Sequence, residues 1–114
     1  MEMEVIELEG NARKVVLHGR LDTPGVGQIE TRFSASIVPG GRRAVVDLSD
    51  VSFIASMGLR MFIAVARATG RSGGKLVLLA PQPMVNEVFV NAALGDIIPI
   101  VFDAEAALAL LAAD

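Results

Sequence analysis

The sequence predicts an α/β fold, in which four helices pack on a mixed, mostly parallel sheet of about five strands. Three observations predict it. Glutamates alternate with apolar residues near the N-terminus, and the Gly10-Asn11 turn and a second apolar run follow, which indicates a hairpin. Nearly continuous apolar runs at residues 44–48 and 75–80 are typical of buried parallel strands. Helical patterns separate the later strands, as crossover connections do.

Each element follows from its local pattern. The expected strands are residues 5–8, 14–21, 44–48, 75–80 and 97–102. Pro99 lies inside the last of them and indicates an edge position. Helices are expected after Thr23 (a candidate N-cap), after Ser56, after Pro83 and after Asp103. A length of 114 residues predicts a single domain, residues 1–114.

Composition excludes several classes of function. The net charge of −3 and the lack of Trp and Tyr give no basic, base-stacking surface, so no nucleic-acid partner is expected. The chain has no cysteine, and His18 is its one histidine, so no metal site and no cofactor are expected. The N-terminus lacks a signal-peptide pattern, and no apolar run reaches the roughly 18 residues of a membrane span. A cytoplasmic protein without membrane insertion is therefore expected.

Ser56 stands between an apolar strand and a helical pattern. Serine is a preferred N-cap, because its oxygen can accept hydrogen bonds from the first free amides of a helix. A helix start also favours anions, so a phosphorylated serine would be well placed there. The local pattern leaves both interpretations open: a cap alone, or a site of modification.

A family resemblance bears on this choice. Residues 45–59, Val-Val-Asp-Leu-Ser-Asp-Val-Ser-Phe-Ile-Ala-Ser-Met-Gly-Leu, resemble the signature of the STAS family, which includes the bacterial anti-sigma factor antagonists. The family turn usually reads Asp-Ser-(Ser/Thr/Ala)-Gly-Leu, and its first serine, the phosphoacceptor, corresponds to Ser56. This chain departs from the pattern at Ala55 and Met57. Residues 19–22 are similar to the family's Gly-x-Leu-Asp segment, so the resemblance places Asp22 near the phosphoacceptor and implies a STAS-type fold.

The helix after Ser56 is apolar on more than one side. A stripe of Leu59, Phe62, Ile63 and Ala66 is expected to face the core. The opposite side carries Met57, Met61, Ala64, Val65 and Ala68, where a solvated helix would carry charge. An exposed apolar patch of this kind indicates a docking site, unless the chain itself or a second copy covers it. The expected partner-binding residues are Asp22, Ser56, Met57, Gly58, Arg60, Met61 and Val65.

Two non-catalytic functions remain open, since no nucleophile–base pair, nucleophile elbow or phosphate loop is visible and no catalytic residue is predicted. The first is an anti-sigma factor antagonist that acts by partner switching, with Ser56 phosphorylated. For it the resemblance implies two partners, an anti-sigma factor that is a GHKL-type serine kinase and a PP2C-type phosphatase. The second is a STAS subunit that is not phosphorylated, in a larger complex such as a lipid-transport ABC system. Neither function fixes the oligomeric state, and a homodimer is compatible with both.

Overall fold

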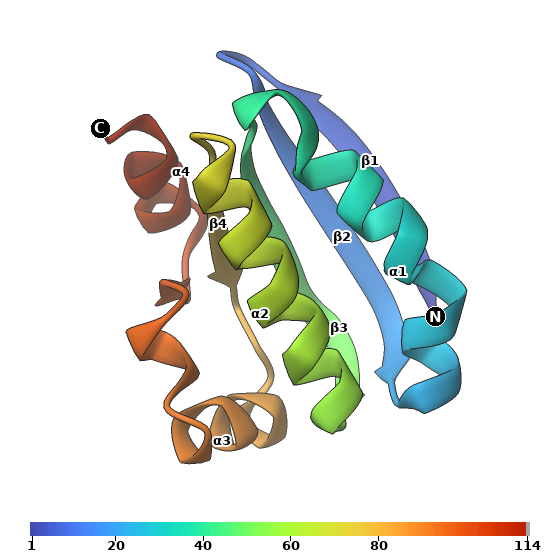
Figure 1. The fold of residues 1–114 in the computed structure, drawn as a ribbon. Coiled ribbons are helices and arrows are strands. Elements are labelled where there is room, and N and C mark those ends of the chain that lie inside the picture. The colour runs from blue at the N-terminus through green and yellow to red at the C-terminus, as the bar shows by residue number, and fades with distance from the viewer. Residues whose placement is uncertain (114) are drawn as a thin grey trace.

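The fold is a five-stranded sheet with helices on both faces (Figure 1). The computed structural model describes residues 1–113. In chain order its elements are β1 (Glu2–Leu8), β2 (Ala12–Leu21), α1 (Thr23–Ile37), η1 (Pro39–Gly41), β3 (Arg43–Ile54), α2 (Ser56–Arg71), β4 (Lys75–Leu79), α3 (Pro83–Asn91), η2 (Leu94–Asp96), β5 (Ile100–Val101) and α4 (Ala104–Ala112). The strand order is β1-β2-β3-β4-β5; β1 is antiparallel to β2, and the other pairs are parallel. The predicted fold class is confirmed.

The helices divide unequally between the two faces of the sheet. The larger core cluster joins α1, α2 and α3 to one face, and three phenylalanines, Phe33, Phe62 and Phe89, meet edge to face within it. The smaller cluster joins α4 to the other face through Ala107 and Leu111. Because α4 has only nine residues, part of this second face carries no helix.

The central strand β3 is longer than its sequence pattern indicated. The apolar run predicted a strand over residues 44–48, but the strand continues to Ile54, and Val51 and Ile54 are buried in the larger core cluster. The ten-residue β2 supplies the partner for this extension, with irregular pairing at Val16/His18 and at Gly19/Arg20. Asp50, which the sequence placed in a loop, therefore lies within β3.

The remaining boundaries differ in smaller ways. Asp22, not Thr23, is the N-cap of α1, and its carboxylate accepts a hydrogen bond of 2.8 Å from the Gly25 amide. Asp103 caps α4 as expected, with a bond of 2.8 Å from the Ala106 amide. β5 has only two residues, because the turn that follows η2 occupies residues 97–98 at the start of the expected strand, but it lies at the sheet edge as Pro99 indicated. Across residues 1–113, no helix combines the length and the hydropathy that a membrane crossing requires.

Candidate functional site

The candidate site is built where β2 and β3 end side by side. Leu21 pairs with Ile54 in the last register position, and the Ala55 amide donates a hydrogen bond of 3.0 Å to the Leu21 carbonyl oxygen. The carboxyl ends of parallel strands meet at one edge of a sheet. The starts of α1 and α2, with Asp22 and Ser56, therefore lie at the same edge.

At the start of α1, Asp22 is held in place by two groups. One carboxylate oxygen accepts from the Gly25 amide, and the other lies 3.5 Å from the Arg20 Nε atom. The hydrogen bond from Gly25 is the main cause that lowers the pKa of Asp22 below 3.8, so this side chain is an anion at neutral pH. Gly25 itself has no room for a side chain, because a Cβ atom there would lie 2.0 Å from the Arg20 carbonyl oxygen.

Ser56 is the first residue of α2, and its side chain is exposed. Of the two interpretations left open for Ser56, the N-cap is wrong: Ala55 occupies the cap position in an extended conformation, and no side chain of the described residues caps the helix. Within residues 1–113, no group forms a hydrogen bond with the Ser56 hydroxyl. The hydroxyl is thus free to react or to bind a partner.

The backbone amides at the start of α2 are only partly paired. The amides of Gly58 and Leu59 donate to the Ala55 carbonyl oxygen at 2.9 and 3.3 Å. The amides of Ser56 and Met57 have no acceptor in the part of the chain that the structure describes. Unpaired amides at a helix start carry partial positive charge and favour anions.

Gly58 has a packing role instead of a surface role. It is buried, and a Cβ atom there would lie 2.8 Å from Ile54 Cγ1 and 3.2 Å from Leu21 Cβ. The absent side chain lets α2 approach the ends of β2 and β3. Gly58, which the sequence placed among the partner-binding residues, is thus turned toward the ends of β2 and β3, and its contact with a partner stays a prediction.

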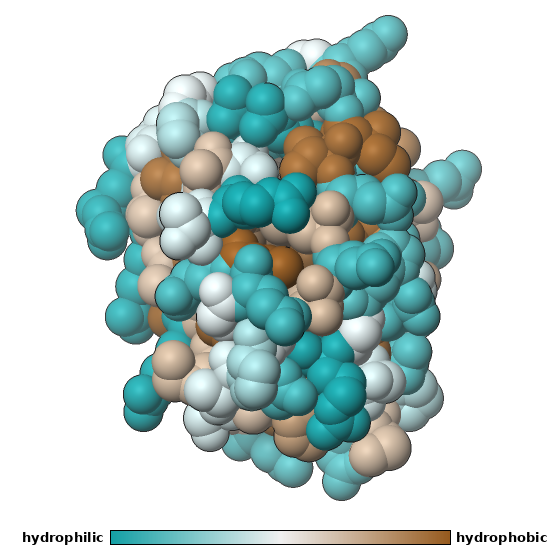
Figure 2. Space-filling view, turned by 90° about the vertical axis from the view of Figure 1, so that its right-hand side faces the viewer, coloured by the Kyte–Doolittle hydropathy of each residue, from teal (hydrophilic) through white to brown (hydrophobic). Residues whose placement is uncertain are grey.

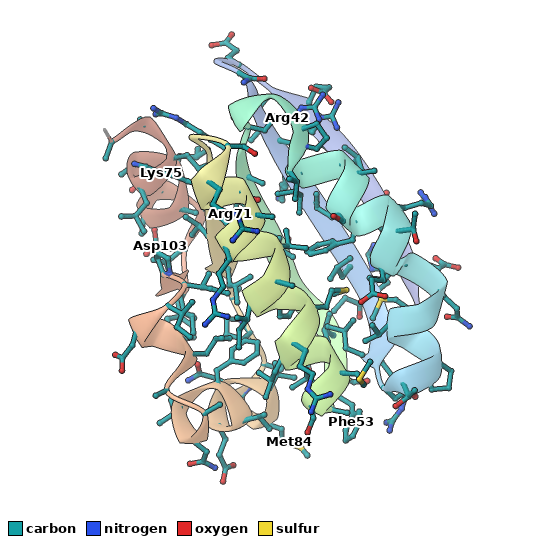
Figure 3. All side chains as sticks on the ribbon, in the orientation of Figure 1. Arg42, Phe53, Arg71, Lys75, Met84 and Asp103 are labelled. Carbon is teal, nitrogen blue, oxygen red and sulfur yellow. The ribbon has the colours of Figure 1, made fainter. Side chains whose placement is uncertain are left out.

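The exposed apolar surface at this edge is centred on Met57, whose exposed fraction is 37%. Arg60 lies one turn further along α2, with its Nη1 atom 4.0 Å from the Met57 sulfur. At the end of β3, the Arg20 guanidinium lies 4.3 Å from the centre of the Phe53 ring. Figure 3 shows Phe53 and Met84 at this same end of the molecule, and Met84 is 71% exposed at the start of α3.

The prediction that the docking surface continues along α2 through Met61 and Val65 is wrong. Met61 and Val65 are 2% and 4% exposed and belong to the larger core cluster. The reason is that α2 has two internal neighbours, the sheet beneath it and α1 beside it, so its apolar residues on both sides face the protein. Of the expected core stripe, Phe62 is fully buried in the same cluster, and Leu59, Ile63 and Ala66 are partly buried against it.

A cluster that sequence reasoning missed lies on the face of the sheet opposite to α1–α3. His18 Nδ1 is 2.6 Å from Asp50 Oδ2, and His18 Nε2 is 2.6 Å from Glu4 Oε2. The hydrogen bond to Glu4, then that to Asp50, raises the pKa of His18 above 6.5. The histidine therefore links three strands, β1, β2 and β3. Residues 1–113 contain no group of three or more His, Cys, Asp or Glu side chains able to hold a metal ion.

The sequence matches the STAS domain family over residues 3–107. It is 36% identical to BtrV of Bordetella bronchiseptica, assigned as an anti-sigma factor antagonist, over 82% of this chain and 80% of that protein. It is 32% identical to the anti-sigma F factor antagonist of Lysinibacillus sphaericus, over 78% of this chain and 80% of that protein. The structure of the Bacillus cell fate determinant SpoIIAA in its phosphorylated form superimposes with a TM-score of 0.71 at 24% identity, over 96% of this chain and 99% of that one. These relatives confirm the expected class, an anti-sigma factor antagonist-like regulatory protein, and the chain belongs to the STAS domain family.

Proposed function

We propose that this chain is an anti-sigma factor antagonist that acts by partner switching, and that Ser56 is its phosphoacceptor. The observation that carries the proposal is the exposed Ser56 hydroxyl, which no other group among residues 1–113 engages. Two relatives of more than 30% identity are named as anti-sigma factor antagonists, and a protein of the same fold has been seen in a phosphorylated form. A regulatory protein with a reactive hydroxyl, and not an enzyme, accounts for these observations together.

The start of α2 is suited to a phosphoserine. A phosphate group would add a charge of about −1.5 to −2 and three strong acceptor oxygens. The free amides of Ser56 and Met57 can donate to these oxygens, and the helix dipole favours the negative charge. Arg60 lies one helical turn away and adds a cation that can approach the phosphate.

The unmodified form would bind its partner through the surface around Ser56. This surface comprises Ser56, Met57, Arg60 and Asp22. Met57 supplies the flexible apolar contact, Arg60 adds a positive charge beside it, and Asp22 adds a negative charge at the same edge of the sheet. Met61 and Val65 take no part in this contact, because α1 and the sheet already cover them.

Phosphorylation would release the partner. The phosphate would stand beside Met57, and a docked partner would remove water from both groups. Burying a dianion costs several kcal/mol unless the partner supplies a matching cation. The switch therefore has a defined sign: the unmodified chain binds and the phosphorylated chain does not.

The partners that fit this proposal are an anti-sigma factor, which is a GHKL-type serine kinase, and a PP2C-type phosphatase that restores the hydroxyl. Such a cycle consumes ATP, so we place the protein in the cytoplasm. The residues proposed for these contacts lie on residues 20–22 and 53–60, where β2 and β3 end and α1 and α2 begin.

Intact-mass analysis tests the proposal. The native chain is incubated with ATP and the serine kinase that it captures from its own organism, alongside Ser56→Ala and Ser52→Ala variants. Ser52 is also exposed and lies four residues away, which makes it the matched control. One added phosphate on the native chain and on Ser52→Ala, but none on Ser56→Ala, is the expected result. No phosphate on any of them, together with co-purification of an ATPase and a permease, would instead support a STAS subunit of a transport complex.

A further inference from the structure

The two edges of the sheet differ in their capacity to bind a further strand. The β5 edge has two residues and follows Pro99, so it offers almost no backbone for pairing. The β1 edge has seven residues, pairs with β2 alone among residues 1–113, and contains no Pro, Gly or Lys. Its outer side therefore presents a full row of backbone donors and acceptors, which is the usual template for strand addition.

Apolar side chains are exposed on both faces of this edge strand. Val5 is 38% exposed on the face that carries Met3 and α1, and Ile6 is 45% exposed on the face that carries Glu4 and His18. Figure 2 views the side of the molecule on which β1 and α1 lie, and brown patches there are surrounded by hydrophilic atoms. An added strand would cover Val5 and Ile6 at once.

The charge pattern of β1 selects the strand that would be added. Glu2, Glu4 and Glu7 would repel an acidic strand at most registers, because like charges directly opposite one another are destabilising. A second copy of β1 avoids this when it runs antiparallel with Val5 facing Val5. In that register Glu4 faces Ile6, Glu2 faces Leu8 and Glu7 faces Met3, so no glutamate is directly opposite another.

The neighbouring registers of the β1–β1 pair oppose glutamates or leave residues of β1 unpaired. Centring the pair on Glu4 places Glu4 against Glu4. A centre between two residues is excluded, because directly opposite residues of one sheet share a face and successive residues of β1 do not. Centring the pair on Ile6 avoids opposed glutamates but leaves Glu2 and Met3 outside the paired strand. The register on Val5 is thus the one that pairs all seven residues of β1 without an opposed pair of glutamates.

We infer that two copies of this chain associate through their β1 strands, antiparallel, with Val5 on the two-fold axis. The two sheets then form one continuous sheet of ten strands. The hydrogen bond from His18 holds the Glu4 carboxylate back on its own sheet, which reduces the repulsion between the two Glu4 side chains that lie diagonally across the axis. Because β2 separates β1 from the strand that leads to Ser56, both Ser56 hydroxyls stay open in the dimer.

Disulfide trapping tests the dimer and its register, since the chain has no cysteine of its own. Residues directly opposite in an antiparallel pair have Cα atoms about 4.5–5.5 Å apart, within the range of a disulfide, whereas diagonal pairs are about 7–8 Å apart. Under mild oxidation, Val5→Cys is expected to form a covalent dimer. Ile6→Cys and Met84→Cys, although more exposed, are expected to stay monomeric on a non-reducing gel.

Analytical ultracentrifugation completes the test without oxidation. The native chain is expected to dimerise reversibly with rising concentration, Val5→Lys to remain monomeric, and the control Val90→Lys, at an exposed α3 position, to dimerise as the native chain does. Val5→Cys cross-linking no faster than Met84→Cys, or a native chain that stays monomeric throughout, would overturn the inference. Preferential trapping of Ile6→Cys would overturn the register. None of these outcomes depends on whether Ser56 is phosphorylated.

Discussion

The amide of Ala55 donates a 3.0 Å hydrogen bond to the carbonyl oxygen of Leu21, and this bond ties the end of β3 to the end of β2. It fixes the starting point of α2 relative to that of α1. Gly58 allows α2 to approach both strand ends, and Gly25 allows α1 to turn tightly over Arg20. The close packing of the α1 and α2 backbones on these strand ends therefore determines where Ser56 lies at the surface.

Gly25 and Gly27, both near the start of α1, should respond in opposite directions to substitution by alanine. Gly25→Ala should lower the free energy of unfolding by about 2 kcal/mol or more, because its Cβ would overlap the Arg20 carbonyl oxygen and force the backbone to move. Gly27→Ala should raise it by about 0.5–1 kcal/mol, since the part of the chain that the structure describes leaves open space around the added Cβ and alanine favours the helix. Urea denaturation measures both. Equal effects of the two substitutions would show that the turn at Asp22 is not tightly packed.

The two methionines of α2 should respond differently to a charge. Met57→Lys should leave the unfolding midpoint nearly unchanged and weaken partner binding, because Met57 is exposed beside Ser56. Met61→Lys should lower the free energy of unfolding by about 3 kcal/mol or more, because it places an unpaired ammonium in the core. Thermal denaturation and a binding titration separate the two effects. A stable Met61→Lys variant would contradict the packing of α2 against α1.

Thr69 is fully buried, and its hydroxyl has no hydrogen-bond partner among residues 1–113. Thr69→Val should therefore raise the free energy of unfolding by about 1 kcal/mol, because the variant keeps the shape of the side chain and removes an unsatisfied polar group. Thr69→Ala is the control, and it should destabilise by leaving a gap. A loss of stability in Thr69→Val would indicate that the hydroxyl is satisfied in solution.

The His18 cluster should make stability depend on pH near neutrality. Its pKa is raised above 6.5, so the contribution of the imidazolium is fully present below 6.5 and is lost as the pH rises through the raised value. The difference in urea midpoint between the native chain and His18→Gln should therefore be largest on the acidic side of neutrality and shrink on the alkaline side. NMR titration of the one histidine gives its pKa directly. A pKa at or below 6.5 would contradict the two hydrogen bonds.

The order of elements and the location of the strand-to-helix corner were predictable, because they depend on local patterns that the later packing reinforces. Apolar runs indicated β3 and β4, and Asp103 identified the start of α4. The orientation of α2 about its own axis, which decides which of its side chains are exposed, was not predictable in the same way. A helix that contacts both a sheet and another helix is apolar on two sides, and its sequence alone does not say which side is open.

The site was predictable in part for the same reason. Ser56 and Met57 were predicted to be exposed, and both are. Met61 and Val65 were also predicted to be exposed, but the orientation of α2 about its axis turns them into the core. The His18 cluster depends on the register of three strands, which brings Glu4, His18 and Asp50 together from separate parts of the sequence. Met84, at the start of α3, lies at the same end of the molecule as Phe53, and no local sequence pattern predicts that the two are close.

A binding titration of the unmodified and the phosphorylated chain against the proposed anti-sigma factor partner measures the switch directly. Phosphate on Ser56 should weaken the complex at least about tenfold, which corresponds to about 1.4 kcal/mol. Equal affinities for the two forms, with mass analysis showing full occupancy of Ser56, would contradict it.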